Sequence, residues 1–456
     1  MLDGGCVFLA SPPDWRPGTM NNSYEDSVKT GITASLKVLQ CYRWLLDLYV
    51  LDFFVDNHWR MLPRSWQDSF YDIDLKTLGH ILMGVPTNQM LPLSFLALLK
   101  TLNFLCLPRQ GTYINEVSFV SDNSKFRNLF LKHVKLKKRH EISLMASVVH
   151  NVALKSSCNS VIDFGSGLGH LVRMLSYNYG LQTVGIECQY KLTDDARKLD
   201  LELEYTAKKY LDEEKVKHLP RPIHCNETLS TADQLEKLAI SSSISNHGLI
   251  GLHPCGDLGP LLIKYFVQYD SAKFICLVGC CYMKLSDTGY PMSQFVSRHD
   301  NRLSYPAREI ACHANEAYFN KLCKGDYNHL KVHAFRAALE NMLIDYDPKL
   351  KHSPIRSVKH TDNMAFESYC AIALERLSLP PAESLNAARY GNLAHIHWKR
   401  VVVLYTLRLA LAPLVETLIL LDRLYYMIEH GIHCEIHAVF DPNISPRNHI
   451  MIGKKL

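Results

Sequence analysis

The chain has 456 residues, of which 47% are hydrophobic and 21% are charged, and its formal net charge is +5. This composition excludes a disordered chain and a strongly basic nucleic-acid coat, and the length allows one large core and a second unit. Fourteen scattered cysteines argue against a disulfide framework, and the first residues, MLDGGCVFLA, lack the regions of a signal peptide. We therefore expect an intracellular protein, cytoplasmic or nuclear.

The N-terminal part of the chain has a helical pattern rich in aromatic residues, from about residue 23 to residue 107. It predicts a helical N-terminal domain over 1–107, followed by a linker over 108–135. Because this segment carries no motif with chemistry of its own, we expect it either to recognise a macromolecular acceptor or to serve as a packing unit. A first α/β segment is then predicted over 136–299.

The α/β segment opens on an amphipathic helix whose head is basic. The helix begins near His133 as HVKLKKRHEISLMASVVHNVA and leads into an apolar strand. Lys138 and His140 stand at its head, just upstream of a glycine-rich turn, and are candidates for contacting a substrate. The alternatives are a solvated helix face for the basic run and a helix cap for His140.

The most informative motif is VIDFGSGLGH at 161–170, a β-branched apolar run followed by alternate glycines. Glycine lets the backbone approach a ligand where a Cβ would collide, and the helix that follows offers free N–H groups. The helix HLVRMLSYNYG and a second strand, LQTVGIE, come next. The strand ends in Glu187, placed to accept the hydroxyls of a ribose. Strand, turn, helix, strand and acid predict a βαβ nucleotide-binding unit.

Glycine spacing indicates which cofactor this unit takes. A dinucleotide fold requires G-x-G-x-x-G, but His170 occupies the third glycine position. G-x-G-x-G preceded by an acid is typical of the S-adenosylmethionine loop of methyltransferases, whereas the alternative is a glycine-rich turn in another α/β protein. The candidate cofactor residues are Asp163, Gly165, Ser166, Gly167, Gly169, His170 and Glu187.

Two later strands end in residues that carry chemistry. GLIGLHPCGDLGP ends its strand at His253, and KFICLVGCCYMKL ends in two cysteines. Because ligands bind beyond the carboxyl ends of parallel strands, both ends are predicted to face the cofactor crevice. His253 and Asp257 are candidate bases, and Tyr282 is a candidate for orienting the acceptor. Cys280 and Cys281 are further catalytic candidates, or else small apolar residues at the end of a buried strand.

The same residues raise the question of a metal. A zinc site from His253, Cys255, Cys280 and Cys281 is conceivable, since all four can converge on one crevice. The spacing lacks a C-x-x-C pair, so we expect no metal.

The C-terminal part is predicted to be a helical and loop elaboration over 300–395, then two helices and a closing β-hairpin over 396–456. Arg308 and His313 lie in AREIACHA and are candidate substrate contacts, or a carboxylate partner and a core histidine. The apolar stretch from Val401 is interrupted by Arg408 and Glu416 and broken at Pro413. Since charges are costly at the centre of a bilayer, we expect packed helices and no membrane span.

A set of motifs spread over nearly the whole chain resembles the methyltransferase-like protein 25 family, including its paralogue described as a ribosomal RNA adenine dimethylase domain protein. The motifs are LPRSW (62–66), KKRHEI (137–142), DFGSGLGHL (163–171), GLHPCGDLGP (251–260), VGCCYMKLS (278–286), GYPMS (289–293), AREIACHA (307–314) and LAPLVETLILLDR (411–423). The resemblance implies a seven-stranded, Rossmann-like α/β methyltransferase sheet with S-adenosyl-L-methionine as cofactor. It implies no particular substrate.

A fainter likeness suggests the substrate class. The two cysteine-bearing strand ends are similar to those of tRNA 2′-O-methyltransferases, although Tyr282 and Met283 stand where that family has two histidines. The Asn/Asp-Pro-Pro-aromatic signature of exocyclic-amine methyltransferases is absent, which disfavours adenine N6 as the acceptor. We therefore expect a methyltransferase acting on RNA, either tRNA or rRNA. The alternatives are a protein acceptor and a scaffold that binds the cofactor without turnover.

Overall fold

The computed structural model describes residues 22–111, 130, 134–209, 220–241, 245–325, 327–355, 358, 364–375, 379 and 384–455. These residues form two compact units. The first unit combines described residues of Met1–Leu36, Leu107–Arg302 and Glu416–Leu456, and the second combines Lys37–Cys106 with Leu303–Val415. Most of the predicted linker at 108–135 lies outside the described residues.

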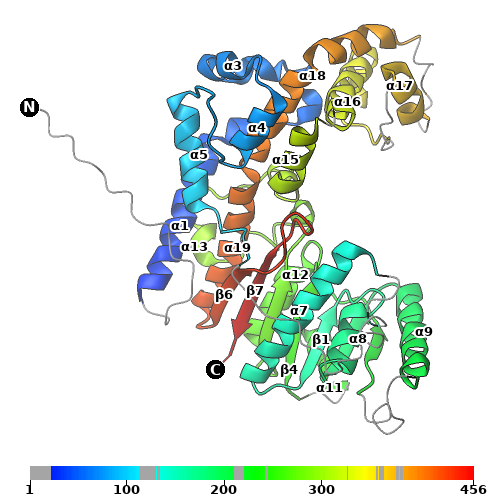
Figure 1. Ribbon diagram of the computed structural model, residues 1–456. Coiled ribbons are helices and arrows are strands. Elements are labelled where there is room, and N and C mark those ends of the chain that lie inside the picture. The colour runs from blue at the N-terminus through cyan, green and yellow to red at the C-terminus, as the bar shows by residue number, and fades with distance from the viewer. Residues whose placement is uncertain are drawn as a thin grey trace, which may run out of the picture. The chain divides into compact units, whose positions relative to one another are not determined.

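The first unit contains a seven-stranded sheet in the order β3-β2-β1-β4-β5-β7-β6 (Figure 1). The first five strands pair in parallel, whereas β7 runs antiparallel to both β5 and β6. The predicted closing hairpin with a reversed last strand is therefore confirmed. The strands are β1 (Ser160–Phe164), β2 (Gln182–Glu187), β3 (Ile223–Asn226), β4 (His247–Leu252), β5 (Ala272–Val278), β6 (His433–Ala438) and β7 (His449–Lys454).

Helices connect the parallel strands, as the βαβ pattern predicted. The described connecting helices are α8 (His170–Tyr177), α9 (Tyr190–Ala207), α11 (Ala232–Ser241) and α12 (Leu258–Gln268). In the same unit α7 (Leu136–Lys155) precedes β1, and η3 (Tyr282–Lys284) and α13 (Gln294–Ser297) follow β5. Two further helices, α1 (Asn22–Cys41) and α19 (Ala412–Glu429), contribute residues to both units.

Both faces of the sheet are buried because its central strands are apolar on both sides. Phe274, Cys276 and Val278 of β5 belong to one hydrophobic cluster with residues of α7 and α8. Ile275 points the other way, where a Cβ added at Gly453 would lie 2.9 Å from both Ile275 and Phe266 of α12. This period of two, with helices on either side, produces the doubly wound sheet.

The second unit is helical and contains both the predicted N-terminal helices and most of the predicted elaboration. Its elements are α2 (Arg43–Leu46), η1 (Val50–Asp52), η2 (His58–Met61), α3 (Arg64–Phe70), α4 (Leu75–Leu82), α5 (Leu93–Leu105), α14 (Tyr305–Ile310), α15 (Asn315–Lys324), α16 (Tyr327–Tyr346), η4 (Pro348–Leu350), α17 (Phe366–Leu374) and α18 (Ala387–Leu409).

The predicted domain division is corrected here, because residues 37–106 do not form a domain by themselves. A Cβ added at Gly79 of α4 would lie 3.2 Å from Phe319 of α15, so these two helices pack closely. The buried Arg408 guanidinium donates to the main-chain oxygens of Leu46 and Pro306. The N-terminal helices therefore bury their apolar faces against residues 303–415.

The apolar stretch near Val401 forms two helices, α18 and α19, with Pro413 in the first turn of α19. Proline is tolerated there because that N–H has no partner within the helix. By length and composition the segment Ala387–Glu429 could cross a membrane, but 89% of its most apolar window is buried in the protein. Such burial is typical of the core helices of a globular fold.

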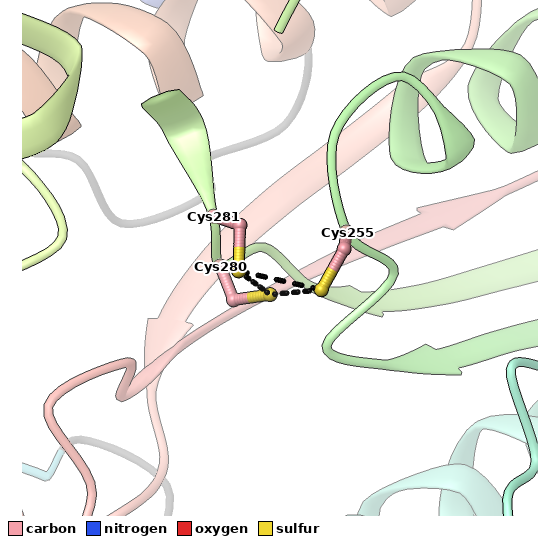
Figure 2. A group of neighbouring side chains, drawn as sticks. All are labelled: Cys255, Cys280 and Cys281. Carbon is pink, nitrogen blue, oxygen red and sulfur yellow. Dashed lines mark hydrogen bonds between the residues drawn. The ribbon is translucent and has the colours of Figure 1, made fainter. Parts of the chain in front are cut away.

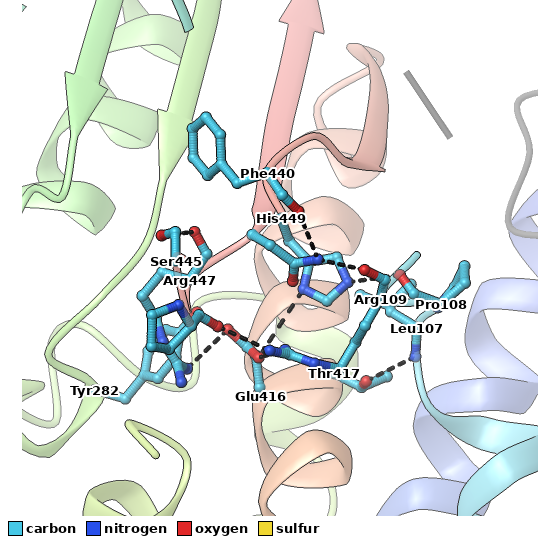
Figure 3. A network of polar contacts seen from close by, with 12 residues as sticks. Leu107, Pro108, Arg109, Tyr282, Glu416, Thr417, Phe440, Ser445, Arg447 and His449 are labelled. Carbon is cyan, nitrogen blue, oxygen red and sulfur yellow. Dashed lines mark hydrogen bonds and ion pairs between the residues drawn. The ribbon is translucent and has the colours of Figure 1, made fainter. Parts of the chain in front are cut away.

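A buried carboxylate, Glu416 on α19, ties the hairpin to the end of β5 (Figure 3). Its Oε1 accepts hydrogen bonds from Arg447 Nη1 at 2.9 Å and from the Tyr282 hydroxyl at 3.0 Å. Its Oε2 accepts from Arg109 Nη1 at 3.2 Å. Burial opposes ionisation of Glu416, but the charges of Arg447, His449 and Arg109 and the hydrogen bond from Tyr282 outweigh it and lower its pKa.

We predict that Glu416→Gln destabilises the protein by about 3 to 5 kcal/mol, because the buried arginines lose their counter-charge. A carboxyl group whose pKa is lowered on folding stabilises the protein at pH values above its ordinary pKa of 4.5. This stability is lost as the pH falls through the native pKa. The gap between wild type and variant in urea unfolding should therefore be full at pH 7 and shrink below pH 4.5. The exposed Glu429→Gln on the same helix is the control and should cost about 1 kcal/mol. Equal losses would contradict this account.

Candidate active site

The glycine-rich turn after β1 has the open geometry that a ligand requires. Gly165 and Gly167 have φ of +70° and +56°, and a Cβ at either position would meet no protein atom within 4 Å. The N–H groups of Gly165 and Ser166 donate to the Ile186 oxygen, which holds the turn against β2. The space beside these two glycines is therefore available for a bound molecule.

The third glycine of the turn has a different role from the one predicted. A Cβ at Gly169 would lie 2.5 Å from His224 Cε1, so this glycine is needed for packing inside the protein. His170, the first residue of α8, has its Nδ1 3.2 Å from Arg173 Nη1. Arg173 in turn forms a buried ion pair with Asp200, which also contacts His224. This network fixes the start of α8 under the turn.

Glu187, at the end of β2, lies beside the turn as predicted. Its carboxylate accepts the N–H groups of Gly167 and Gln189, each at 3.0 Å. Asn226, which ends β3, donates to the Glu187 main-chain oxygen at 2.9 Å and was not singled out from the sequence. The acid is thus held next to the glycine that has open space beside it.

Asp163, at the carboxyl end of β1, is a fully buried acid. Burial raises its pKa to about 7, although the charge of Lys138 opposes this shift and that of Glu187 adds to it. Lys138 on α7 is exposed and yet close enough to act on Asp163, so the basic helix head lies near the turn.

These residues fit S-adenosylmethionine by the chemistry of their donors and by space. A buried carboxylate with a raised pKa is well suited to pair with the ammonium group of a ligand. Asp163 would supply this carboxylate, and the methionine portion of the cofactor would supply the ammonium. Gly165 and Gly167 leave room for that portion, and Glu187 can accept the two hydroxyls of a ribose.

The end of β4 brings a histidine and a glutamate together. His253 has φ +70°, a left-handed conformation uncommon for a residue with a side chain. Its Nε2 lies 2.9 Å from Glu141 Oε1, while its Nδ1 is buried and has no hydrogen-bond partner within the described structure. Strain and an unpartnered nitrogen at a strand end are features of functional sites.

Glu141 is a site residue that we did not select from the sequence, although it lies in the KKRHEI motif. Burial would raise its pKa, but the hydrogen bond and the charge of His253, the hydrogen bond from Ser445 and the charge of Lys137 lower the pKa to about 2. If Nε2 donates to ionised Glu141, the neutral imidazole of His253 has its lone pair on Nδ1. The signal available in the sequence was the spacing of Lys137 and Glu141, an acid four residues after a lysine on one helix.

Three thiols meet at the ends of β4 and β5 (Figure 2). Cys255 Sγ lies 3.3 Å from the Sγ atoms of both Cys280 and Cys281, which are 3.5 Å apart. Contacts with Cys280 and Cys281 lower the pKa of Cys255 against the effect of burial, and Lys284 contributes in the same direction. The predicted convergence of the two strand ends is thus present in the structure.

Tyr282 is corrected as a candidate for orienting an acceptor. Its side chain is 2% exposed, and its hydroxyl donates to Glu416 in the core. Asp257 Oδ1 accepts the Ser286 N–H at 2.9 Å, so this predicted base also fixes a neighbouring loop.

The predicted substrate contacts lie in different places. His140 Nε2 accepts the Asp441 N–H at 2.9 Å, so it ties α7 to the hairpin turn and is corrected to a structural role. Arg308 and His313 belong to the second unit, where His313 pairs with Glu309 at 2.6 Å. Their contact with substrate stays a prediction.

Part of this chain is similar to known proteins. Residues 137–288 match the family model described as a methyltransferase domain. A mouse protein named probable methyltransferase-like protein 25 is 29% identical over 226 residues, which cover 45% of this chain and 37% of that protein. The human protein of the same name is 28% identical over 224 residues, covering 45% and 36%. The aligned part thus spans little more than a third of each relative.

Two solved structures are remotely similar. The plantazolicin methyltransferase BamL is 13% identical with a TM-score of 0.20, and the match covers 61% of this chain and 84% of that one. Coclaurine N-methyltransferase is 8% identical with a TM-score of 0.24, covering 94% and 100%. The strand order of the sheet and the geometry of the glycine-rich turn define the fold.

The reversed seventh strand, the open glycine turn and the acids at the ends of β1 and β2 agree with the match of residues 137–288 to a methyltransferase domain. The predicted resemblance to methyltransferase-like protein 25 is confirmed as a similarity over 45% of this chain.

We predict that Gly167→Arg abolishes cofactor binding in calorimetry, because the side chain would fill the open space beside the turn. Gly180→Arg is the matched control, since Gly180 also has a positive φ, of +72°, and open space around it. Both variants carry a backbone cost of about 1 to 2 kcal/mol. Equal cofactor affinity in the two variants would contradict the assignment of the cofactor site to this turn.

We further predict that Asp163→Asn stabilises the cofactor-free protein at pH 8 by about 1 to 4 kcal/mol. A carboxyl pKa raised from 3.8 to about 7 contributes stability below pH 3.8 that is lost as the pH rises through 7. Asparagine does not undergo this loss, so the melting temperatures should converge near pH 4. Cofactor affinity should fall in the same variant, because the ligand ammonium loses its counter-charge. A pH-independent difference in melting would contradict the raised pKa.

Proposed function

We propose that this protein transfers a methyl group to RNA, with a ribose hydroxyl as the acceptor. The observation that carries the proposal is the first part of α7, which brings Glu141 to His253 and also presents a basic turn. A protein acceptor and a scaffold without turnover are the competing functions.

The basic turn supports an anionic acceptor. Lys135, Lys137, Lys138 and Arg139 are all exposed on consecutive positions around Leu136. Phosphate groups bind such clusters, and the free N–H groups of a helix start add to the attraction. The charge of Lys138 lowers the pKa of Asp163, so the basic cluster lies near the carboxyl end of β1.

The His253–Glu141 pair supports a hydroxyl acceptor. Methyl transfer is an in-line displacement, for which bound S-adenosylmethionine supplies an activated methyl carbon. A hydroxyl must lose its proton as it attacks, so it needs a base, whereas a neutral ring nitrogen does not. His253 Nδ1 is buried in the structure, so it can take that proton after a side-chain movement that exposes it to the acceptor. Ionised Glu141 then stabilises the charge that develops on the ring.

We predict that Glu141→Gln lowers kcat about 100-fold or more and leaves the cofactor Kd unchanged, since the amide cannot stabilise a charged imidazole. The control is Glu435→Gln on β6, because Glu435 forms a similar partly buried pair with His437 at 2.7 Å. The control should retain kcat. A kcat equal to wild type in Glu141→Gln would exclude the pair from catalysis.

The acceptor class is tested with methyl-labelled cofactor and separated RNA and protein fractions from cells that lack the gene. Labelled RNA, with the label on ribose after digestion to nucleosides, is the expected result. Replacement of Lys137 and Lys138 by glutamate should raise the KM for RNA and weaken its salt dependence. Label confined to protein would overturn the RNA proposal, and no label in either fraction would favour the scaffold.

A further inference from the structure

The three thiols at the strand ends form a compact triangle that is open to solvent. Cys255 is exposed, and Cys280 and Cys281 are half-buried. Their sulfur atoms come from two loops and lie 3.3 to 3.5 Å apart. In Figure 2 all three side chains point toward a common centre.

A role as apolar spacers does not account for this arrangement. A cysteine that merely ends a buried strand would be enclosed by apolar side chains, as Cys276 is within β5. Here the His253 main-chain oxygen lies 3.5 Å from Cys255 Sγ and 3.6 Å from Cys280 Sγ, which orients both thiols toward each other. Sulfur is a weak hydrogen-bonding atom, so these contacts contribute little stability by themselves.

The sulfur separations are a few tenths of an ångström shorter than those of thiolates around one small ion. Zinc binds thiolate sulfur at about 2.3 Å, for which ideal tetrahedral angles give sulfur separations of roughly 3.8 Å. An ion about 2.3 Å from all three sulfurs fits even the present triangle, if it lies roughly 1.2 Å out of their plane. Small side-chain rotations would then open the triangle by the remaining few tenths of an ångström.

We propose that Cys255, Cys280 and Cys281 bind one Zn²⁺ ion through three thiolates, with a fourth coordination position open. The imidazole of His253, which the sequence suggested as a fourth ligand, is not part of this group, in which the three sulfur atoms lie within 4.8 Å of one another. The open position would be taken by water or by a soft donor atom of a ligand, as in zinc sites that keep an exchangeable position. The proposal concerns metal binding alone and is independent of the RNA proposal.

Binding of the ion would release protons, because each thiol must become a thiolate. No redox change accompanies this step, since zinc has a single stable oxidation state. The competing explanation for clustered thiols is a disulfide, which can join only two of the three and requires an oxidant. The two explanations differ in stoichiometry and in the effect of reductant.

The test is metal titration of the full-length chain, purified under reducing conditions and freed of metal. Cd²⁺ alone, used as a spectroscopic substitute, should produce ultraviolet thiolate-to-metal charge transfer whose intensity corresponds to three sulfurs and which saturates at one equivalent. Zn²⁺ affinity is measured by competition with a chromogenic chelator. Cys280→Ser should weaken Zn²⁺ binding about 100-fold or more.

Two further variants keep the outcome decisive. Cys255→Ser removes the exposed ligand with the least risk to folding, and it should lower affinity as Cys280→Ser does. Cys41→Ser removes another exposed cysteine and should leave binding unchanged. Calorimetry with S-adenosylmethionine confirms that each variant is folded. The proposal is overturned if no charge transfer appears, if Cys255→Ser and Cys280→Ser both bind like wild type, or if peptide mapping of the unreduced protein finds Cys255 joined to either partner.

Discussion

The buried carboxylate of Glu416 is the interaction on which the arrangement of the first unit depends. It lies on a helix near the C-terminus and is bound by Arg109, Arg447 and Tyr282, which come from three separate segments. Tyr282 directly follows Cys281, so the ion pair also fixes where the second strand end lies. An ionised acid inside a protein is stable only with such complete pairing. The cysteines at the end of β5 are thus positioned by a contact with a buried carboxylate on another helix.

A second carboxylate, Glu141, fixes the other strand end in a similar way. It accepts from His253 and from Ser445, so one acid joins α7, the end of β4 and the hairpin turn. The two carboxylates have the same structural role. Each is a buried anion on a helix that binds a residue of the loop after a central strand. The chemistry of the loops can vary while the anions maintain their positions.

Much of the first unit could be predicted from local pattern. β1, β2, β4 and β5 are apolar runs ended by acids, glycines or cysteines, and period and turn chemistry indicate such elements directly. Glu187 and the glycines follow from spacing. The role of Gly169 did not, because its close contact with His224 comes from a strand more than fifty residues away. Glu141 was missed for the same reason, since its partner His253 is adjacent only in space.

The domain division could not be read from composition. The helices over 37–106 look self-contained in sequence, yet their apolar faces are covered by residues 303–415. Tyr282 illustrates the opposite error, since a tyrosine beside two cysteines suggests a solvent-facing hydroxyl, whereas its ring is packed in the core. Burial depends on long-range packing, which a local window of sequence does not contain.

The order of the strands has a consequence for synthesis of the chain. β5 ends at Val278, but its partner β7 begins only at His449, after the whole of residues 303–415 has been made. Until then, while the chain is still on the ribosome, the apolar strand β5 forms an unpaired edge of the parallel half of the sheet. Such an edge tends to associate with other chains. Completion of the sheet is therefore a late event, and truncated chains that stop before the hairpin would be expected to require chaperones.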